Sequence, residues 1–328
     1  MQIPSLLKIT IIFTLCVILM GAYTRLSDAG LGCPDWPGCY GMLKVPNQAH
    51  ELTQVQNLFP GHEVEPKKAW LEMIHRYIAG ALGLLVLLIF ILCLKKNEAP
   101  KKLPAIIAVL IVFQAALGMW TVTMKLMPIV VMSHLIGGFT LISLLLLLYL
   151  RTKPLFLSSA ETLTRALAPF ALACLGILIL QIIIGGWTSS NYAALACTSL
   201  PICEGDWYKN INLIQAFNPF QGDHDSYEFG VLDYASRMTI HVTHRFWAIV
   251  TAVMLFLLAF KLYQQSQSPL LKRSAVLLVA LVCLQVALGI SNVVLHLPLG
   301  IAVSHNAGAA LLLLNVVFIN YVLWKKSN

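Results

Sequence analysis

The chain has 328 residues, of which 59% are hydrophobic and only 11% are charged. Soluble domains carry about 25% charged residues, so this composition excludes a water-soluble globular protein. The formal net charge of +8 does not require nucleic acid as a partner, because lysine and arginine of membrane proteins gather in cytoplasmic loops. We therefore expect a lipid membrane, and no nucleic acid, around this chain.

Eight apolar segments are long enough to cross a hydrocarbon core of about 30 Å as helices. In chain order they are Leu7–Tyr23, Trp70–Leu94, Leu103–Thr123, Ile129–Leu150, Ala166–Thr188, Arg237–Tyr263, Ala275–Val294 and Gly300–Trp324. They are apolar nearly all round instead of alternating, which excludes transmembrane β-strands. The sequence predicts an all-α integral membrane protein with eight transmembrane helices.

The basic residues predict the orientation of these helices. Most lysines and arginines fall on one side of the membrane, around residues 8, 95–102, 151–165, 261–273 and 325–326. The two long connections, about residues 25–69 and 189–236, lie on the other side and contain most of the acidic residues. Since basic residues mark the cytoplasmic side, we expect both termini in the cytoplasm and both long connections outside.

Each long connection contains two cysteines, Cys33 and Cys39 in the first and Cys197 and Cys203 in the second. Disulfides persist in the oxidising compartment outside the cytoplasm, so these pairs are expected to form disulfides that hold the loops. For Cys33 and Cys39 a redox-active role in electron transfer is the alternative, because thiol–disulfide exchange is also electron transfer.

The chain also contains an internal duplication. Five motifs recur in the same order: Gly21–Thr24 with Gly185–Thr188, Cys33–Cys39 with Cys197–Cys203, His75-Arg76 with His244-Arg245, Gln114–Gly118 with Gln285–Gly289, and Ser133-His134 with Ser304-His305. Because each copy contains an even number of spans, the copies are parallel repeats. We expect two tandem pseudo-symmetric four-helix bundles, residues 1–150 and 166–328, joined by a cytoplasmic linker at 151–165.

Four histidines of this duplication lie at similar depth, within roughly 10 Å of the outer boundary; they are His75, His134, His244 and His305. Histidines inside a bilayer are costly and indicate function. Two imidazoles on facing helices suit six-coordinate heme iron, which predicts two heme sites. The alternative is that each ring only hydrogen-bonds a neighbouring helix. Zinc is disfavoured because no third or fourth ligand lies at that depth.

Two arginines adjoin these histidines. Arg76 and Arg245 are placed to bind heme propionates through charge-assisted hydrogen bonds.

Glu72 lies one helical turn outward of His75, and the duplication aligns it with His241. Only the first half therefore offers a carboxylate, which could accept a proton or stabilise a cationic intermediate. The alternative is a plain ion pair of Glu72 with Arg76 or Lys68. His241 is left without an assigned role. This asymmetry suggests that one site does chemistry and the other holds a redox cofactor.

Together these motifs resemble the bacterial heme A synthase family across nearly the whole chain. They are Thr24-Arg25-Leu26 with Ser27 to Gly30, the Cys33–Cys39 loop, Glu72-x-x-His75-Arg76, Gln114–Gly118, Ser133-His134 and their C-terminal copies.

The resemblance implies an oxidoreductase of heme biosynthesis in the bacterial inner membrane. Such an enzyme oxidises the C8 methyl of heme O to a formyl group by two successive hydroxylations, giving heme A for terminal oxidases. It implies His75 and His134 as ligands of the substrate heme and Glu72 as the catalytic carboxylate. It implies heme b as the cofactor, between His244 and His305. Arg25 would act at the substrate site only, because serine follows Thr188 in the second copy.

Two other functions fit the paired histidines: a diheme b-type cytochrome that only transfers electrons, and a heme transporter or chaperone. The resemblance also implies heme O synthase as the donor of heme O, and an electron acceptor. The sequence does not identify that acceptor, the oxygen source, the route of heme entry or the oligomeric state, a homo-oligomer included.

Overall fold

The computed structural model describes residues 3–96, 99–152, 161–203 and 205–325. Within these residues, eight helices are long and apolar enough to cross a membrane. They are α1 (Ile3–Leu26), α3 (Pro66–Lys95), α4 (Lys102–Thr123), α5 (Pro128–Arg151), α7 (Ala168–Ser190), α9 (Tyr234–Gln265), α10 (Pro269–Val294) and α11 (Leu299–Trp324). The prediction of an all-α protein with eight apolar spans is confirmed.

The helix ends are set by capping residues, which an apolar window does not detect. α3 begins at Pro66, before the predicted start at Trp70, because proline fits the first turn of a helix. α9 begins after Asp233, whose carboxylate accepts a hydrogen bond from the Ser236 backbone N–H at 2.9 Å. The fifth predicted span, Ala166–Thr188, corresponds to α7, and a short helix, α6 (Thr162–Arg165), precedes it.

The long connections contain short helices that the sequence analysis did not predict: α2 (Ala49–Leu58), η1 (Trp207–Asn210) and α8 (Leu213–Ala216). Glu51 stabilises the start of α2, since it accepts hydrogen bonds from the Asn47 and Gln48 backbone N–H groups and pairs with Lys44 at 2.6 Å. The Asn47 N–H, then Lys44 and the Gln48 N–H, lower the pKa of Glu51 to about 2.

The contacts divide the chain into two units, which are described separately. The first comprises residues 1–141 and 219–231, and the second comprises 142–218 and 232–328. The division predicted from sequence, at residues 150 and 166, stays a prediction, and most of its linker lies outside the described residues.

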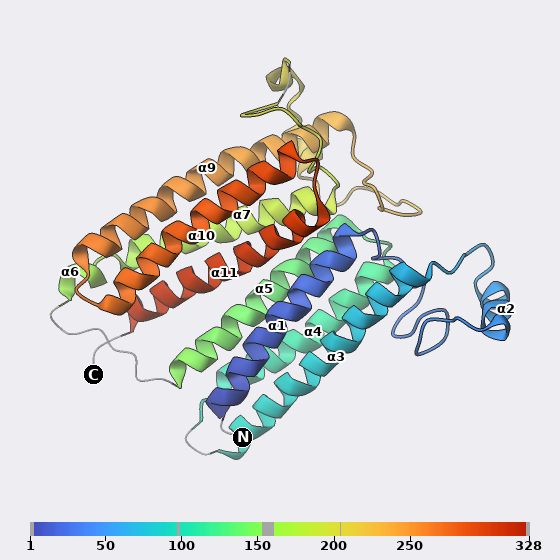
Figure 1. The fold of residues 1–328 in the computed structure, drawn as a ribbon, viewed down its shortest axis with the longest axis horizontal. Coiled ribbons are helices and arrows are strands. Elements are labelled where there is room, and N and C mark those ends of the chain that lie inside the picture. Colours follow the sequence, from blue (N-terminus) through green and yellow to red (C-terminus); the bar gives the residue numbers. More distant parts are fainter. Residues whose placement is uncertain (1–2, 97–98, 153–160, 204, 326–328) are drawn as a thin grey trace. The chain divides into compact units, whose positions relative to one another are not determined.

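In the first unit α3 packs against α1 and α4, and Figure 1 shows these helices side by side. The first part of α5 completes the bundle through two glycines. A Cβ at Gly138 would lie 3.7 Å from Ile18 of α1, and one at Gly137 would clash with Gln114 of α4. The absence of a side chain at these two positions lets the helices approach closely.

In the second unit four helices form a closed ring. α7 packs against α9, α9 against α10, α10 against α11 and α11 against α7, as can be followed in Figure 1.

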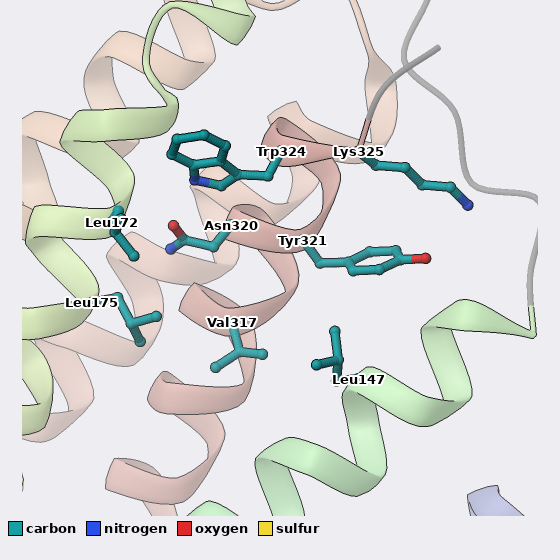
Figure 2. A pocket seen from close by; sticks show the side chains of 8 residues that line it. All are labelled: Leu147, Leu172, Leu175, Val317, Asn320, Tyr321, Trp324 and Lys325. Carbon is teal, nitrogen blue, oxygen red and sulfur yellow. The ribbon is translucent and has the colours of Figure 1, made fainter. Parts of the chain in front are cut away.

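This unit also contains an apolar groove near the end of α11, with a volume of about 350 Å³ (Figure 2). Its lining residues are Leu147, Leu172, Leu175, Val317, Asn320, Tyr321, Trp324 and Lys325. None of these residues is a histidine, so the groove is separate from the predicted heme sites.

Candidate functional site

In the first unit, each predicted heme ligand contacts a glycine of a neighbouring helix. His75 of α3 packs on Gly21 of α1, where a Cβ would lie 2.8 Å from the imidazole Cε1. His134 of α5 packs on Gly118 of α4, where the corresponding distance is 3.5 Å. A missing side chain thus makes room for each ring, and the contact with Gly21 is the tighter of the two.

The second unit has the same arrangement. His244 of α9 packs on Gly185 of α7, and His305 of α11 packs on Gly289 of α10, with Cβ-to-Cε1 distances of 3.0 and 3.5 Å. Gly21 and Gly185 belong to one pair of repeated motifs, and Gly118 and Gly289 belong to another. In both units the first histidine makes the tighter glycine contact and the second histidine makes the looser one. This agreement supports the duplication inferred from the sequence.

A glutamine also lies beside the second histidine of each unit. Gln114 reaches Gly137 in the first unit, and Gln285 reaches Gly308 in the second, so closely that a Cβ at either glycine would collide with the amide. In the second unit the Gln285 amide donates to the His305 carbonyl at 3.2 Å. Gln285 thus holds the helix turn that carries His305, whereas the Nε2 of Gln114 is buried without a hydrogen-bond partner.

The imidazoles fit a role as heme ligands. The Nδ1 atoms of His75, His134 and His305 are buried and have no hydrogen-bond partner. These three Nδ1 atoms therefore form no hydrogen bond with a neighbouring helix. No group of three or more His, Cys, Asp or Glu that could hold a metal ion occurs among the described residues. Paired imidazoles are the donor set that heme iron requires.

Glu72 is buried, with 4% of its surface exposed, and both of its oxygens have partners. Oε2 accepts a hydrogen bond from the Cys33 backbone N–H at 2.8 Å, and Oε1 pairs with Arg76 at 2.5 Å. Lys68, the other predicted partner, pairs with Glu65 instead. The carboxylate is therefore fixed between the helix that carries His75 and the first long connection.

Both cysteine pairs form disulfides, with Cα–Cα distances of 4.8 Å for Cys33–Cys39 and 5.1 Å for Cys197–Cys203. The predicted disulfides are confirmed. Whether Cys33–Cys39 has a redox role stays a prediction.

Arg76 holds the first disulfide loop on α3. Its Nη1 donates to the carbonyl oxygens of Asp35 at 2.9 Å and Pro37 at 3.3 Å, and also to that of Gly38. The guanidinium therefore joins the loop, Glu72 and the helix turn next to His75. Its role as a propionate ligand stays a prediction, since these donors are directed at the loop.

Arg245 does the same in the second unit. It donates to the carbonyl oxygens of Cys197 at 2.6 Å, Ser199 at 2.7 Å and Ile202 at 3.1 Å. Its Nε also donates to Nε2 of the buried His241 at 3.2 Å. His241 thus takes the structural place of Glu72, and the second unit has no carboxylate there.

Arg25 lies at the end of α1 in the first unit, near a segment that the sequence analysis assigned to the other half. Residues 219–231 of the second long connection belong to this unit, and the Tyr227 N–H donates to the Lys125 carbonyl at 3.0 Å. Burial raises the pKa of Glu228 in this segment, against the opposing charges of Lys68 and Arg25. Sequence patterns could not reveal that residues 219–231 lie near Arg25, because this segment is far from Arg25 in the chain.

The sequence comparisons agree with this geometry. The chain matches the COX15-CtaA family, described as a cytochrome oxidase assembly protein, over residues 5–317. It is 69% identical over 328 residues to the heme A synthase of Shewanella oneidensis, a match that covers 100% of this chain and 98% of that protein. The chain belongs to the heme A synthase family.

More distant members of the heme A synthase family also match along most of their length. The heme A synthase of Chelativorans sp. is 24% identical over 329 residues, covering 92% of this chain and 86% of that protein. That of Maricaulis maris is 26% identical over 322 residues, covering 92% of this chain and 90% of that protein. The resemblance inferred from the motifs is confirmed.

Proposed function

We propose that this member of the heme A synthase family oxidises heme O in its first unit and holds heme b in its second. The family assignment makes the chain an oxidoreductase that converts heme O to heme A. The position of Glu72 is the observation that supports different roles for the two units. A buried carboxylate lies one turn from His75 in the first unit, and the neutral His241 takes its place in the second.

In the first unit His75 and His134 bind the iron of the substrate, heme O. The glycines opposite both rings make room for the imidazoles against α1 and α4. The apolar bundle interior accommodates the porphyrin and keeps water away from the reacting methyl group.

In the second unit His244 and His305 bind heme b. When bound, this heme accepts single electrons and passes them on. The protein contributes the paired imidazoles, the tight packing of His244 on Gly185, and Arg245, which fixes the loop above the site.

Glu72 moves protons at the substrate site. With water as the oxygen source, each hydroxylation of the C8 methyl gives up two protons and two electrons, the electrons to the acceptor, and a carboxylate near the porphyrin edge can take up the protons. The Cys33 N–H and Arg76 each donate a hydrogen bond to this carboxylate and hold it in place. Arg25 at the same end of the unit supplies positive charge for the propionates of heme O.

The chain is a multi-pass membrane protein, and the excess of basic residues on one side supports a cytoplasmic location for both termini in the bacterial cell. Its partners are the heme O synthase that supplies the substrate and an acceptor for the electrons removed from it.

Variants of Glu72 test this assignment, with His241→Gln as the matched control at the equivalent place. General acid–base catalysis contributes about 10²–10⁴-fold, so Glu72→Gln is expected to lower the rate of heme O conversion by that range. Heme O and heme b should both stay bound, and His241→Gln should retain conversion. The measurement is extraction and chromatography of the hemes from purified protein after incubation with heme O.

Two outcomes contradict the proposal. If Glu72→Gln converts heme O at the wild-type rate, Glu72 has no role in the proton transfer. If the wild-type protein contains only heme B, at two equivalents per chain, the protein is an electron-transfer cytochrome instead. A heme transporter would bind heme O in the wild type and release it unchanged.

A further inference from the structure

One histidine of the second unit has a side chain at its Nδ1 atom. Gln181 of α7 places its Nε2 3.2 Å from Nδ1 of His244 on α9 and 3.4 Å from the His244 carbonyl oxygen. The other amide atom, Oε1 of Gln181, is buried and has no hydrogen-bond partner. A polar amide inside an apolar helix thus faces the imidazole that packs on Gly185.

In the described part of the first unit, no side chain forms a hydrogen bond with Nδ1 of His75. The motif that pairs Gly185 with Gly21 aligns Gln181 with Val17, which is buried with 8% of its surface exposed. Correspondingly, Nδ1 of His75 has no partner. Both units therefore have a glycine that contacts the first histidine ring. They differ at the position that is Gln181 in the second unit and Val17 in the first.

This difference matters for iron binding. A neutral imidazole that binds iron through Nε2 carries its proton on Nδ1, and an acceptor for that proton fixes the ring orientation and raises the basicity of the ligand. Rotation of the Gln181 amide by half a turn directs Oε1 at Nδ1, which gives the Nδ1 proton an acceptor and Oε1 a partner, in exchange for the contact of Nε2 with the His244 carbonyl.

We propose that Gln181 is a positioning residue that fixes His244 as a permanent heme ligand and lowers the reduction potential of that heme. The inference rests on the proposed function, in which the second unit holds heme b. A more basic imidazole stabilises ferric iron, so the hydrogen bond lowers the potential. Val17 leaves His75 without this hydrogen bond, as suits a ligand that must bind heme O and release heme A.

The test compares Gln181→Met and Gln181→Glu in the full-length protein. Methionine fills similar space without an acceptor, whereas a carboxyl group supplies one in either protonation state. Loss of a supporting hydrogen bond to a metal ligand typically costs 10–100-fold in metal affinity. A tenfold loss of ferric binding, with ferrous binding unchanged, corresponds to a rise of about 59 mV for a one-electron couple. Gln181→Met should therefore raise the heme b potential by about this amount, and Gln181→Glu should keep it at or below the wild-type value.

Val17→Gln is the reciprocal variant, and it should slow release of the heme product from the first unit without changing the heme b potential. Potentials come from redox titration of the heme b absorbance, and ligand orientation from electron paramagnetic resonance. An unchanged potential in Gln181→Met, or equal shifts of the same sign in both Gln181 variants, overturns the inference, because packing alone would explain equal shifts. A heme b spectrum that survives His244→Ala would instead refute the heme b site itself.

Discussion

Gly21→Ala tests the contact between α1 and the His75 ring. The added Cβ would lie 2.8 Å from the imidazole Cε1, about 0.6 Å short of ordinary van der Waals contact at 3.4 Å. The ring must therefore move, and preorganised sites tolerate displacements of only about 0.5 Å. A misplacement of about 1 Å can cost roughly 100-fold in rate. We expect Gly21→Ala to lower heme O conversion by at least about tenfold.

The chain offers matched controls for this experiment. A Cβ at Gly80 of α3 or at Gly176 of α7 meets nothing within 4 Å, and alanine favours a helix over glycine by about 1 kcal/mol. Both control variants should keep their hemes and be at least as stable as the wild type. Gly118→Ala should be nearly neutral too, since its Cβ would lie in ordinary contact at 3.5 Å.

The assay combines heme extraction with a conversion rate and a thermal unfolding curve. Gly21→Ala should impair the first unit and retain heme b, while Gly185→Ala, with a Cβ at 3.0 Å from His244, should reduce heme b content. If Gly21→Ala behaves like Gly80→Ala in all three measurements, the packing of His75 on Gly21 does not determine the geometry of the site.

Three further predictions concern the long connections. Arg76→Met removes several hydrogen bonds from a partly buried guanidinium, each worth up to about 1.5–3 kcal/mol, so the first loop should become sensitive to protease while the helices persist. Replacement of Cys197 and Cys203 by serine should lower the free energy of unfolding by roughly 2 kcal/mol, measured in denaturant with the wild type as control. The pKa of Glu51 is lowered from 4.5 to about 2, so its stabilisation of α2 should be complete above about pH 4.5 and lost as the pH falls toward 2. Hydrogen exchange of the α2 amides would show this loss of stabilisation. Lys44→Met should move the loss to higher pH. Exchange protection that is independent of pH in both the wild type and Lys44→Met would contradict the prediction.

The membrane spans were predictable because their signal is local. An apolar run of sufficient length specifies a transmembrane helix whatever lies beside it, as in α4, where the predicted and observed ends nearly coincide. The disulfides were predictable for a similar reason, because both partners of each pair lie within one short loop. The ends of α3 and α9 were less predictable, since proline and an aspartate cap extend these helices beyond the apolar run.

The histidines were predictable as a set, because their repetition at equal depth excludes chance. Their surroundings were not, because a glycine under an imidazole belongs to another helix and only packing reveals it. The same applies to Gln181, which lies on α7 far from His244 in the sequence. Arg76 and Arg245 were expected to face propionates, and the structure directs their donors to loop carbonyls, which have no sequence signature.

The attachment of each disulfide loop to an arginine has a consequence for biogenesis. Arg76 adjoins His75 and Arg245 adjoins His244, so each loop is tied to the residue next to a predicted ligand. We therefore expect oxidation of the loop cysteines to favour the loading of heme. A cell that fails to oxidise these loops is expected to accumulate inserted protein with less bound heme.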